Sequence, residues 1–307
     1  MSSRYPHSIV PPIILIIGKN GQVGWELHRS LSCIGQVIAL GRDDLDLSSS
    51  DKIRETIDLI MPNIIVNAAA YTAVDKAEEE SDEAFFINAS VPGVIANAAS
   101  RIGALFVHYS TDYVFDGTKN APYLETDDTS PINVYGQSKL KGEQEIQSHQ
   151  GDFLILRTSW VYASRGMNFM LSMLRLAKER EELRIVSDQT GSPTPARLIS
   201  DVTSHVLKKA ICERVEGVFE SGIYNLTTSG QTTWYDFARN IIKQGKESLD
   251  FNDYRIQNVT AIDTADYPTP AKRPLYSCLS CEKLTKHYDI HLPDWNEQLV
   301  LCLSELE

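Results

Sequence analysis

The segment Ile13-Ile-Leu-Ile-Ile-Gly-Lys-Asn-Gly-Gln-Val-Gly24 decides the fold of this chain. Its first five residues are wholly apolar and mostly β-branched, which is typical of a strand buried on both faces of a parallel sheet. A glycine-rich turn with the spacing G-x-x-G-x-x-G follows, and then a helical pattern at residues 25–31. Strand, glycine turn and helix in this order are the context that a dinucleotide fingerprint requires.

The glycine turn has a physical reason to hold a nucleotide. Glycines permit a tight turn and close approach of the backbone, while a helix N-terminus offers N–H groups and a positive dipole end to a pyrophosphate. We therefore expect Gly18 and Asn20 to contact a cofactor. An ordinary turn between a strand and a helix is the alternative.

Outward from this segment, apolar strands and helices alternate. Strands are predicted at 37–40, 63–67, 104–109 and 153–156, and helices at 48–60, at 82–101 and from about residue 130. This rhythm predicts an α/β fold with a doubly wound, Rossmann-like parallel sheet and right-handed crossovers. Ligands in such sheets bind beyond the carboxyl ends of the strands. Gly18, Ala68 and Ser110 each come directly after a strand.

Beyond residue 160 the pattern is looser and richer in loops. Helices are predicted at 168–179, 196–210, 233–244 and near 293–305, with short strands at 183–186 and 222–226. We expect a dinucleotide-binding domain at residues 12–160 and a smaller, irregular, mainly substrate-binding domain at 161–307. Elements near 183–226 are expected to return to the first domain.

Composition limits the classes of partner. The 307 residues carry a net charge of −12, which argues against general nucleic-acid binding because that needs a basic footprint. No apolar run approaches the roughly 20 residues of a membrane span. Five scattered cysteines suggest reduced thiols and a cytoplasmic protein. Residues 1–12 are expected to be a loose leader.

The second strand ends in Gly41-Arg42, where NAD-selective proteins usually place a carboxylate. Arg42 could instead meet a 2′-phosphate, so we expect NADPH to be accepted, with NADH left open. A solvated loop arginine is the alternative.

The segment Tyr135-Gly-Gln-Ser-Lys139 carries the candidate chemistry. Tyrosine and lysine four apart on a helix share one face, and a nearby ammonium lowers a phenol pKa from its reference near ~10. Hydride transfer to a ketone needs a proton donor and a group that holds the oxygen. We expect Tyr135 as the acid, Lys139 as its tuner and a ribose ligand, and Thr111 as the donor to the oxygen. No metal is required.

Several long segments resemble the dTDP-4-dehydrorhamnose reductases, a family of the extended short-chain dehydrogenase/reductase superfamily. They lie at residues 18–27, 66–78, 108–115, 130–142, 157–162, 174–180, 188–194 and 267–274. The resemblance implies NAD(P)H-dependent reduction of the 4-keto group of a nucleotide sugar, dTDP-4-dehydro-L-rhamnose to dTDP-L-rhamnose. It also implies Thr111, Tyr135 and Lys139 as catalytic residues.

The same resemblance implies contacts to both ligands. For the cofactor these are Gly21, Gln22 and Val23 at the pyrophosphate, Asp46 and Leu47 by the adenine, and Ala70, Tyr71, Thr72 and Tyr109 along the rest. Asp112 and Trp160 would contact the sugar together with Thr111.

One departure concerns metal. Some members of this family dimerise through Mg²⁺ held partly by a glutamate at the position of Glu26, but the second glutamate of that site falls on Arg197 here. We therefore expect no metal, and a monomer or weak homodimer. Arg197 is expected to pair with Glu26 of a neighbour or to point into solvent.

Two other functions remain open. The superfamily includes the regulatory β subunit of methionine adenosyltransferase, which is similar around Ser110 and Tyr135, so a non-catalytic, cofactor-binding subunit is one alternative. A reductase of another nucleotide sugar is the second.

Overall fold

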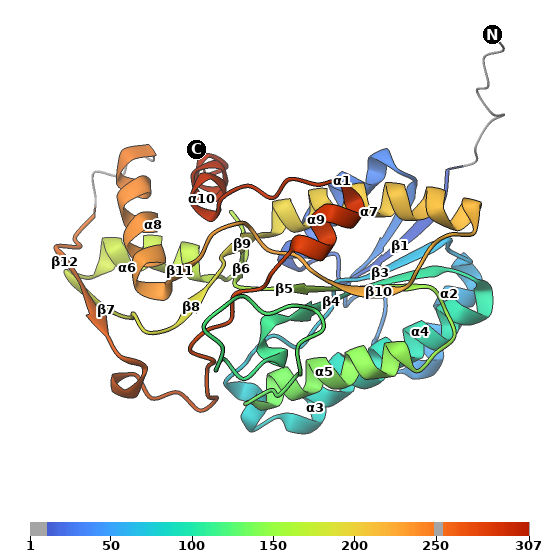
Figure 1. Cartoon of the computed structure of the whole chain (residues 1–307), viewed down its shortest axis with the longest axis horizontal. Helices are drawn as coiled ribbons and strands as arrows, with labels where there is room; N and C mark the ends of the chain where they lie inside the picture. The colour runs from blue at the N-terminus through green and yellow to red at the C-terminus, as the bar shows by residue number, and fades with distance from the viewer. Residues whose placement is uncertain (1–10, 249–253, 307) are drawn as a thin grey trace, which may run out of the picture.

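The computed structural model of the protein describes residues 11–248 and 254–306, so most of the leader expected at 1–12 lies outside the described residues. At its centre is a parallel sheet of six strands (Figure 1). The strands run in the order β10 (Gly222–Asn225), β5 (Phe153–Thr158), β4 (Leu105–Thr111), β3 (Ile64–Asn67), β1 (Ile13–Ile17) and β2 (Gln36–Leu40). The order reverses direction at β1, between β2 and β3, so the doubly wound parallel fold is confirmed.

Helices cover both faces of this sheet. In Figure 1, α1 (Gln22–Ser30) and α7 (Ala196–Glu216) lie above it, and α2 (Ser50–Ile60), α4 (Val91–Ile102) and α5 (Val134–Gln147) lie below. The unbroken apolar run of β1 follows from this arrangement. Ile14 and Ile16 belong to one buried cluster with α1 and α7, and Leu15 and Ile17 to another with α2 and α4.

The single helix expected at 82–101 is interrupted. The structure has α3 (Ser81–Phe85), a π-helical turn (Phe86–Ser90) and then α4. Within the turn, Asn88 donates from Nδ2 to the Tyr71 carbonyl at 3.0 Å and to Ser138 Oγ at 2.9 Å. Such turns are frequent at functional sites, and this one joins the segment after β3 to α5.

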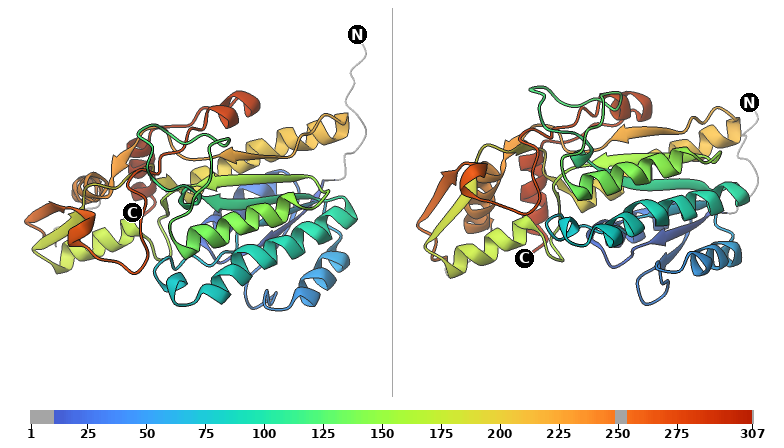
Figure 2. Two further views of the ribbon diagram at one scale, coloured as in Figure 1. Left: turned by 60° about the horizontal axis from the view of Figure 1, so that its bottom comes forward. Right: turned by 90° about the horizontal axis from the view of Figure 1, so that it is seen from below.

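A second unit projects from one end of the sheet (Figure 2). It contains α6 (Phe169–Glu179), α8 (Trp234–Ser248), α10 (Trp295–Ser304) and β7 (Glu182–Val186), which pairs in parallel with β12 (Asn258–Ile262). The sequence did not predict β12 or α9 (Glu282–Tyr288). This outer unit has its own buried cluster, which includes Met170, Phe237 and Leu299. The chain leaves the unit twice for the central sheet, once through α7 and β10 and once through α9, which packs on both of them.

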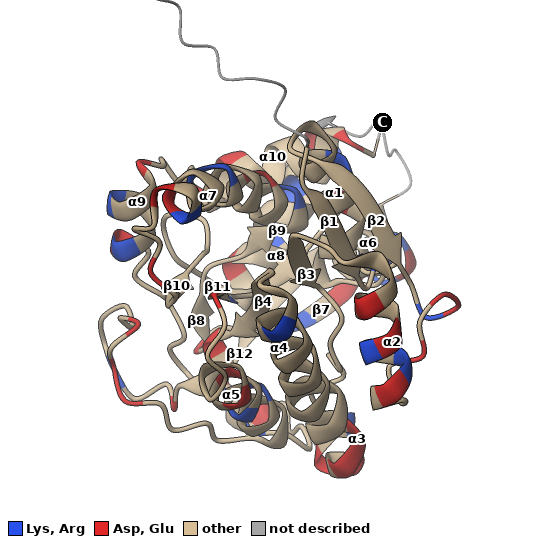
Figure 3. Ribbon diagram, turned by 90° about the vertical axis from the view of Figure 1, so that its right-hand side faces the viewer, with Lys and Arg blue, Asp and Glu red and all other residues tan. Residues whose placement is uncertain are grey.

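Two short pairs of strands lie in the segments that connect the central sheet to the outer unit. β6 (Val161–Tyr162) pairs with β9 (Thr194–Pro195), and β8 (Thr190–Gly191) pairs with β11 (Thr232–Thr233). Among the described residues no helix is both long and apolar enough to cross a bilayer. Acidic and basic residues are mixed on the outer helices, as α2, α7 and α9 show in Figure 3.

Candidate active site

The glycine turn after β1 is shaped by close backbone contacts. Gly18 has φ +95°, and a Cβ there would lie 2.7 Å from the backbone nitrogen of Ala69. A Cβ on Gly24 would lie 2.1 Å from the Gly18 carbonyl oxygen. Both positions therefore require glycine. Gly21 is the N-cap of α1 and supplies no side-chain cap, so the first N–H groups of the helix remain available to an anion.

The side chains of Asn20, Gln22 and Val23 contact neighbouring parts of the fold. Asn20 lies against Gly41 at the end of β2, because a Cβ on Gly41 would be 2.9 Å from Asn20 Nδ2. Gln22 accepts a hydrogen bond at Oε1 from Asn168 Nδ2 at 2.9 Å. Val23 packs against the apolar cluster under α1. The turn and the loop after β2 are thus in contact.

The loop after β2 carries three of the expected cofactor residues. Arg42 is exposed. Asp46 accepts at Oδ1 from the backbone N–H and the hydroxyl of Ser48, at 3.0 and 2.6 Å, and Leu47 packs on the core cluster under α2. The sequence did not single out Lys19, which forms an ion pair with Asp44 at 2.7 Å beside this loop.

The segment after β3 is fixed by two asparagines. Asn67 Oδ1 accepts from the Ala69 N–H at 3.1 Å, and Asn88 Oδ1 accepts from the Tyr71 N–H at 2.9 Å. Ala70 lies between them, and Thr72 follows exposed at the surface. The Tyr71 hydroxyl donates to Glu80, and this bond raises the pKa of Tyr71 to about 12. Asn88 was missed because its partners are distant in sequence.

Thr111 and Asp112 stand at the carboxyl end of β4, and both are buried. The strand runs two residues further than the sequence predicted, through Ser110 and Thr111. Asp112 accepts hydrogen bonds from the Thr111 hydroxyl and the Ser159 hydroxyl, each at 3.0 Å. Burial raises the pKa of Asp112 to about 6, against the opposing effect of these hydroxyls.

Tyr135 lies in the first turn of α5, which begins after the N-cap Asn133. Asn133 Oδ1 accepts from the Gly136 N–H at 2.8 Å, a capping contact that fixes the start of the helix. The Tyr135 phenol lies beside the Thr111 side chain, which acts to lower the pKa of the phenol. The structure therefore brings the expected acid and the expected oxygen-holding donor together.

The prediction that Lys139 lowers the pKa of Tyr135 is wrong in this structure. Burial raises the pKa of Tyr135 to about 12, the charge of Asp112 acts in the same direction, and the Thr111 side chain opposes them. Lys139 points to β4 instead, where its Nζ donates to the Tyr109 carbonyl at 2.6 Å and lies 3.2 Å from His108 Nε2.

Lys139 itself is fully enclosed. Burial lowers its pKa to about 8, while Glu143 one turn further along α5 acts in the opposite direction. The Glu143 carboxylate is bound twice by Arg157, at 2.9 and 2.7 Å. Tyr109 lies beside Lys139 and is hydrogen-bonded through its hydroxyl to Thr203 at 2.8 Å.

Trp160, expected at the sugar, is held by aromatic stacking. Its ring stacks on Trp234 of α8 with centroids 3.5 Å apart and planes 8° apart. A Cβ on Gly191 would meet its indole at 2.4 Å. Trp160 also has φ 45°, a conformation that costs a non-glycine residue about 1–3 kcal/mol and clusters at functional sites. Trp234 was not predicted, because only the fold brings α8 to this position.

The expectation for Arg197 is corrected by the structure. Arg197 Nε donates to Glu26 Oε2 of the same chain at 2.7 Å, and its second nitrogen lies 3.6 Å from Glu305. The guanidinium, whose side chain is 49% exposed, therefore pairs within its own chain. It forms an intramolecular pair because α7 packs on α1. Within residues 11–248 and 254–306, no three potential metal-ligating side chains of His, Cys, Asp or Glu form a cluster.

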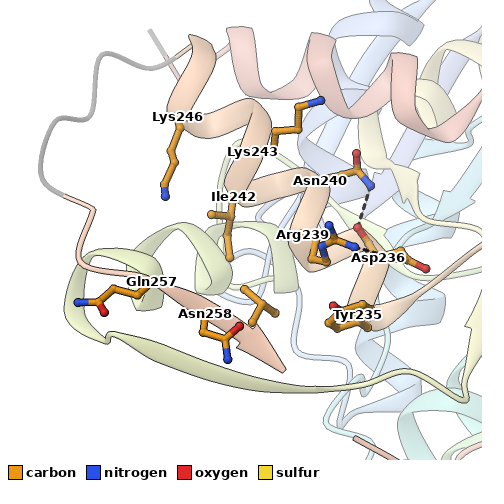
Figure 4. A pocket seen from close by; sticks show the side chains of 10 residues that line it. Tyr235, Asp236, Arg239, Asn240, Ile242, Lys243, Lys246, Gln257 and Asn258 are labelled. Carbon is orange, nitrogen blue, oxygen red and sulfur yellow. Dashed lines mark hydrogen bonds and ion pairs between the residues drawn. The ribbon is translucent and has the colours of Figure 1, made fainter. Parts of the chain in front are cut away.

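A separate hollow of ≈ 750 Å³ lies on the outer unit between α8 and β12 (Figure 4). Lys243 and Lys246 line it together with Asn258. None of the residues expected from the sequence belongs to it. The candidate active site is therefore the edge of the central sheet formed by the glycine turn, the end of β4 and the first turns of α5.

Comparison with known proteins places the chain in a family. The sequence model of the RmlD substrate binding domain matches residues 13–307. The dTDP-4-dehydrorhamnose reductase of Burkholderia thailandensis is 50% identical over 293 residues, which cover 95% of this chain and 98% of that protein. The enzyme of the same name from Escherichia coli K12 is 46% identical over 297 residues, covering 95% and 97%.

A solved structure agrees with these relatives. The dTDP-4-dehydrorhamnose reductase of Bacillus anthracis, crystallised in complex with NADP, superposes with a TM-score of 0.86 at 33% identity, covering 96% of this chain and 99% of the other. Sequence and fold match over nearly the whole length of each protein. The chain belongs to the RmlD family, together with these dTDP-4-dehydrorhamnose reductases.

Proposed function

We propose that this protein is an NAD(P)H-dependent reductase that converts dTDP-4-dehydro-L-rhamnose to dTDP-L-rhamnose. The observation that carries the proposal is the position of Tyr135 beside the Thr111 side chain at the carboxyl end of β4, at the same edge of the sheet as the glycine turn. The similarity of the chain to dTDP-4-dehydrorhamnose reductases over nearly its whole length supports the substrate class.

The protonation of Tyr135 suits reduction. Because burial raises the pKa of Tyr135 to about 12, the phenol keeps its proton at neutral pH and is available as an acid. The Thr111 hydroxyl, which donates to Asp112 in this structure, would turn to donate to the ketone oxygen, and Tyr135 would deliver the proton that oxygen acquires. Ser138, directly before Lys139, bonds to the Tyr135 carbonyl at 2.8 Å and steadies the turn that carries the phenol.

The residues present fit a nicotinamide dinucleotide. The turn at Gly18 and Gly24 leaves a cradle that any Cβ would fill, and the uncapped N-terminus of α1 offers N–H groups to a pyrophosphate. Arg42 would meet a 2′-phosphate, Lys139 a ribose, and the remaining expected cofactor residues the rest of the molecule. The bound dinucleotide would supply the hydride.

Further parts of the proposal concern the substrate and the state of the protein. Asp112 and Trp160 would contact the sugar, and the unit formed mainly by residues 161–307 would hold the nucleotide of the substrate against the dinucleotide-binding unit at 12–160. We further propose a cytoplasmic monomer or weak homodimer, with no nucleic-acid partner and no Mg²⁺ between subunits.

Turnover is the direct test. Purified protein is mixed with NADPH and dTDP-4-dehydro-L-rhamnose, loss of NADPH absorbance is followed, and the product sugar is identified. Tyr135→Phe should lower kcat by about 10²–10⁴ and leave cofactor affinity nearly unchanged. Tyr235→Phe, in the hollow of the outer unit, is the matched control and should keep full activity.

Three outcomes would contradict the proposal in different ways. NADPH binding without oxidation by any 4-keto sugar would favour a regulatory subunit. Faster turnover of a different nucleotide sugar would correct the substrate. A Tyr135→Phe variant with more than about a tenth of the wild-type kcat would remove Tyr135 as the acid.

A further inference from the structure

The loop at residues 269–277, the strap, runs between β12 of the outer unit and α9. It lies beside β8, because the Thr190 N–H donates to the Leu275 carbonyl at 2.8 Å. Pro274 packs on the loop after β4, since a Cβ on Gly117 would lie 2.5 Å from Pro274 Cβ. The strap therefore connects the outer unit to the edge of the central sheet that forms the candidate active site. The proposed reaction assigns it no role.

The strap is held by the carboxylate of Asp75, in the segment after β3. Arg273 Nη2 donates to Asp75 Oδ2 at 2.8 Å, and the Ala271 N–H donates to Asp75 Oδ1 at 3.2 Å. The second nitrogen of Arg273, Nη1, donates to the Ala271 carbonyl at 2.9 Å. The Arg273 side chain is 17% exposed and that of Asp75 is 43% exposed. Both oxygens of one carboxylate thus bind the strap to the segment that follows β3.

The residue that caps α5 also binds the strap. Asn133, which is 3% exposed, donates from Nδ2 to the Lys272 carbonyl at 2.8 Å and accepts at Oδ1 from the Gly136 N–H at 2.8 Å. A carbonyl only accepts and an N–H only donates, so the two partners fix the orientation of this amide. Capping alone needs an acceptor, which serine or aspartate supplies as well as asparagine. The NH₂ group is the additional feature of Asn133, and it joins the helix cap to the strap.

Tyr135 lies within the turn that these contacts hold. Its neighbour Val134 donates from the backbone N–H to Glu78 Oε1 at 2.9 Å, and Glu78 belongs to the same segment as Asp75. The start of α5 and the strap are therefore bound to each other through Asn133 and are both bound to one segment after β3. A shift of the strap is transmitted to the turn that carries the phenol, and a misplacement of about 1 Å can cost about 10² in rate.

We propose that Asn133 and Arg273 are positioning residues, which hold Tyr135 in place by binding the start of α5 to the strap. The inference rests on the proposed function in one respect, the role of Tyr135 as proton donor. The expected cofactor residues directly after β3 do not depend on the strap, since the side chains of Asn67 and Asn88 bind their backbone. Release of the strap should therefore impair proton delivery and spare cofactor binding.

The coupling between strap and helix can be measured without turnover. Amide hydrogen exchange is followed at single residues in the full-length wild-type protein and in Arg273→Met. The Gly136 amide should exchange about tenfold faster in the variant, the change expected on loss of a charge-assisted hydrogen bond, while residues 143–147 of the same helix keep their wild-type rates. Arg101→Ala is the matched control, because it removes an exposed ion pair with Asp58 and should leave Gly136 unchanged. Unchanged exchange at Gly136, or an equal rise along the whole helix, would overturn the inference.

Asn133→Ser separates the bond to the strap from the cap. Serine still caps the helix and adds no charge, but it has no amide to donate to the Lys272 carbonyl. In Asn133→Ser and in Arg273→Met, kcat should fall by about 10–100-fold, and the Kd for NADPH should stay within about twofold of wild type. A role in structure alone would lower kcat and the number of NADPH-binding sites together, which would overturn the inference, as would an unchanged kcat in both variants.

A double-mutant cycle tests whether the two residues act through the same strap. Arg273→Met made together with Asn133→Ser should lower kcat little more than the larger single change, because either change already releases the strap from α5. Losses that multiply would show two independent contacts and would overturn the inference. Absence of wild-type turnover would refute the proposed function instead, and the exchange rates would then decide the coupling by themselves.

Discussion

Removing the Arg197 side chain should destabilise the protein, because it leaves the buried carboxylate of Glu26 without its charged partner. Arg197 Nε lies 2.7 Å from Glu26 Oε2, and the two side chains are 49% and 5% exposed. Breaking a fully buried pair costs about 3–5 kcal/mol, whereas an exposed pair contributes at most about 1 kcal/mol. With one partner buried and the other half open to solvent, we expect Arg197→Ala to lower the free energy of unfolding by about 1–3 kcal/mol.

Arg197→Glu extends the same reasoning to metal binding. It would place a second carboxylate beside Glu26, and Glu305 lies within reach of the present guanidinium at 3.6 Å. In EDTA this variant should be less stable than Arg197→Ala, because a second carboxylate would lie beside the buried carboxylate of Glu26. Mg²⁺ at about 100 times its dissociation constant should restore about 2.7 kcal/mol, since carboxylates are ligands of that ion.

The assay is urea denaturation of wild type and both variants, each with EDTA and with Mg²⁺. Neither EDTA nor Mg²⁺ should change the stability, the activity or the apparent mass of the wild-type protein. Arg175→Ala is the control, because Arg175 forms an exposed pair with Glu179 at 2.8 Å and should cost less than about 1 kcal/mol. A chelator-induced change in wild-type mass, or an Arg197→Ala variant as stable as wild type, would refute the reasoning.

Three further predictions concern the candidate active site. Lys139→Met should lower both kcat and NADPH affinity in steady-state and binding measurements, and unchanged affinity would exclude a ribose contact. Arg42→Ala should weaken NADPH by the roughly 1.5–3 kcal/mol of a charge-assisted hydrogen bond and spare NADH, so equal weakening of both in titrations would exclude the 2′-phosphate contact. Asp112 has a pKa of about 6 when folded, above about 3.9 unfolded, so the native state binds more protons between these values and stability falls as pH rises through them. Asp112→Asn should lack this fall of up to about 3 kcal/mol between pH 4 and 7 in denaturation curves, and an unchanged pH dependence would place the proton on another group.

Much of the central sheet could be predicted from the sequence, because its strands are short apolar runs with one physical meaning. The run of β1 is buried on both faces, and the alternation with helices then leaves few topologies. β12 was missed for the opposite reason. Asn258-Val-Thr-Ala-Ile262 is mixed in polarity, and it becomes a strand by pairing with β7, more than seventy residues away in sequence.

The candidate site also has parts that could be predicted from the sequence and parts that could not. Thr111 and Tyr135 could be placed together because strand ends and helix starts gather at one edge of a parallel sheet. The pKa of Tyr135 could not be predicted, since spacing along a helix says nothing of burial or of the direction in which Lys139 extends. The π-helical turn at Asn88 depends on bonds to Tyr71 and Ser138. The pair between Arg197 and Glu26 likewise depends on helix packing.

The stacked indoles of Trp160 and Trp234 give the protein an optical property of its own. Rings with centroids 3.5 Å apart are close enough to couple their electronic transitions, so we expect the pair to contribute a circular-dichroism signal that depends on the relative orientation of the two indoles. One ring follows β5 and the other opens α8 of the outer unit. Any change in the spacing of these two elements therefore alters the spectrum, and the protein needs no added chromophore to record it.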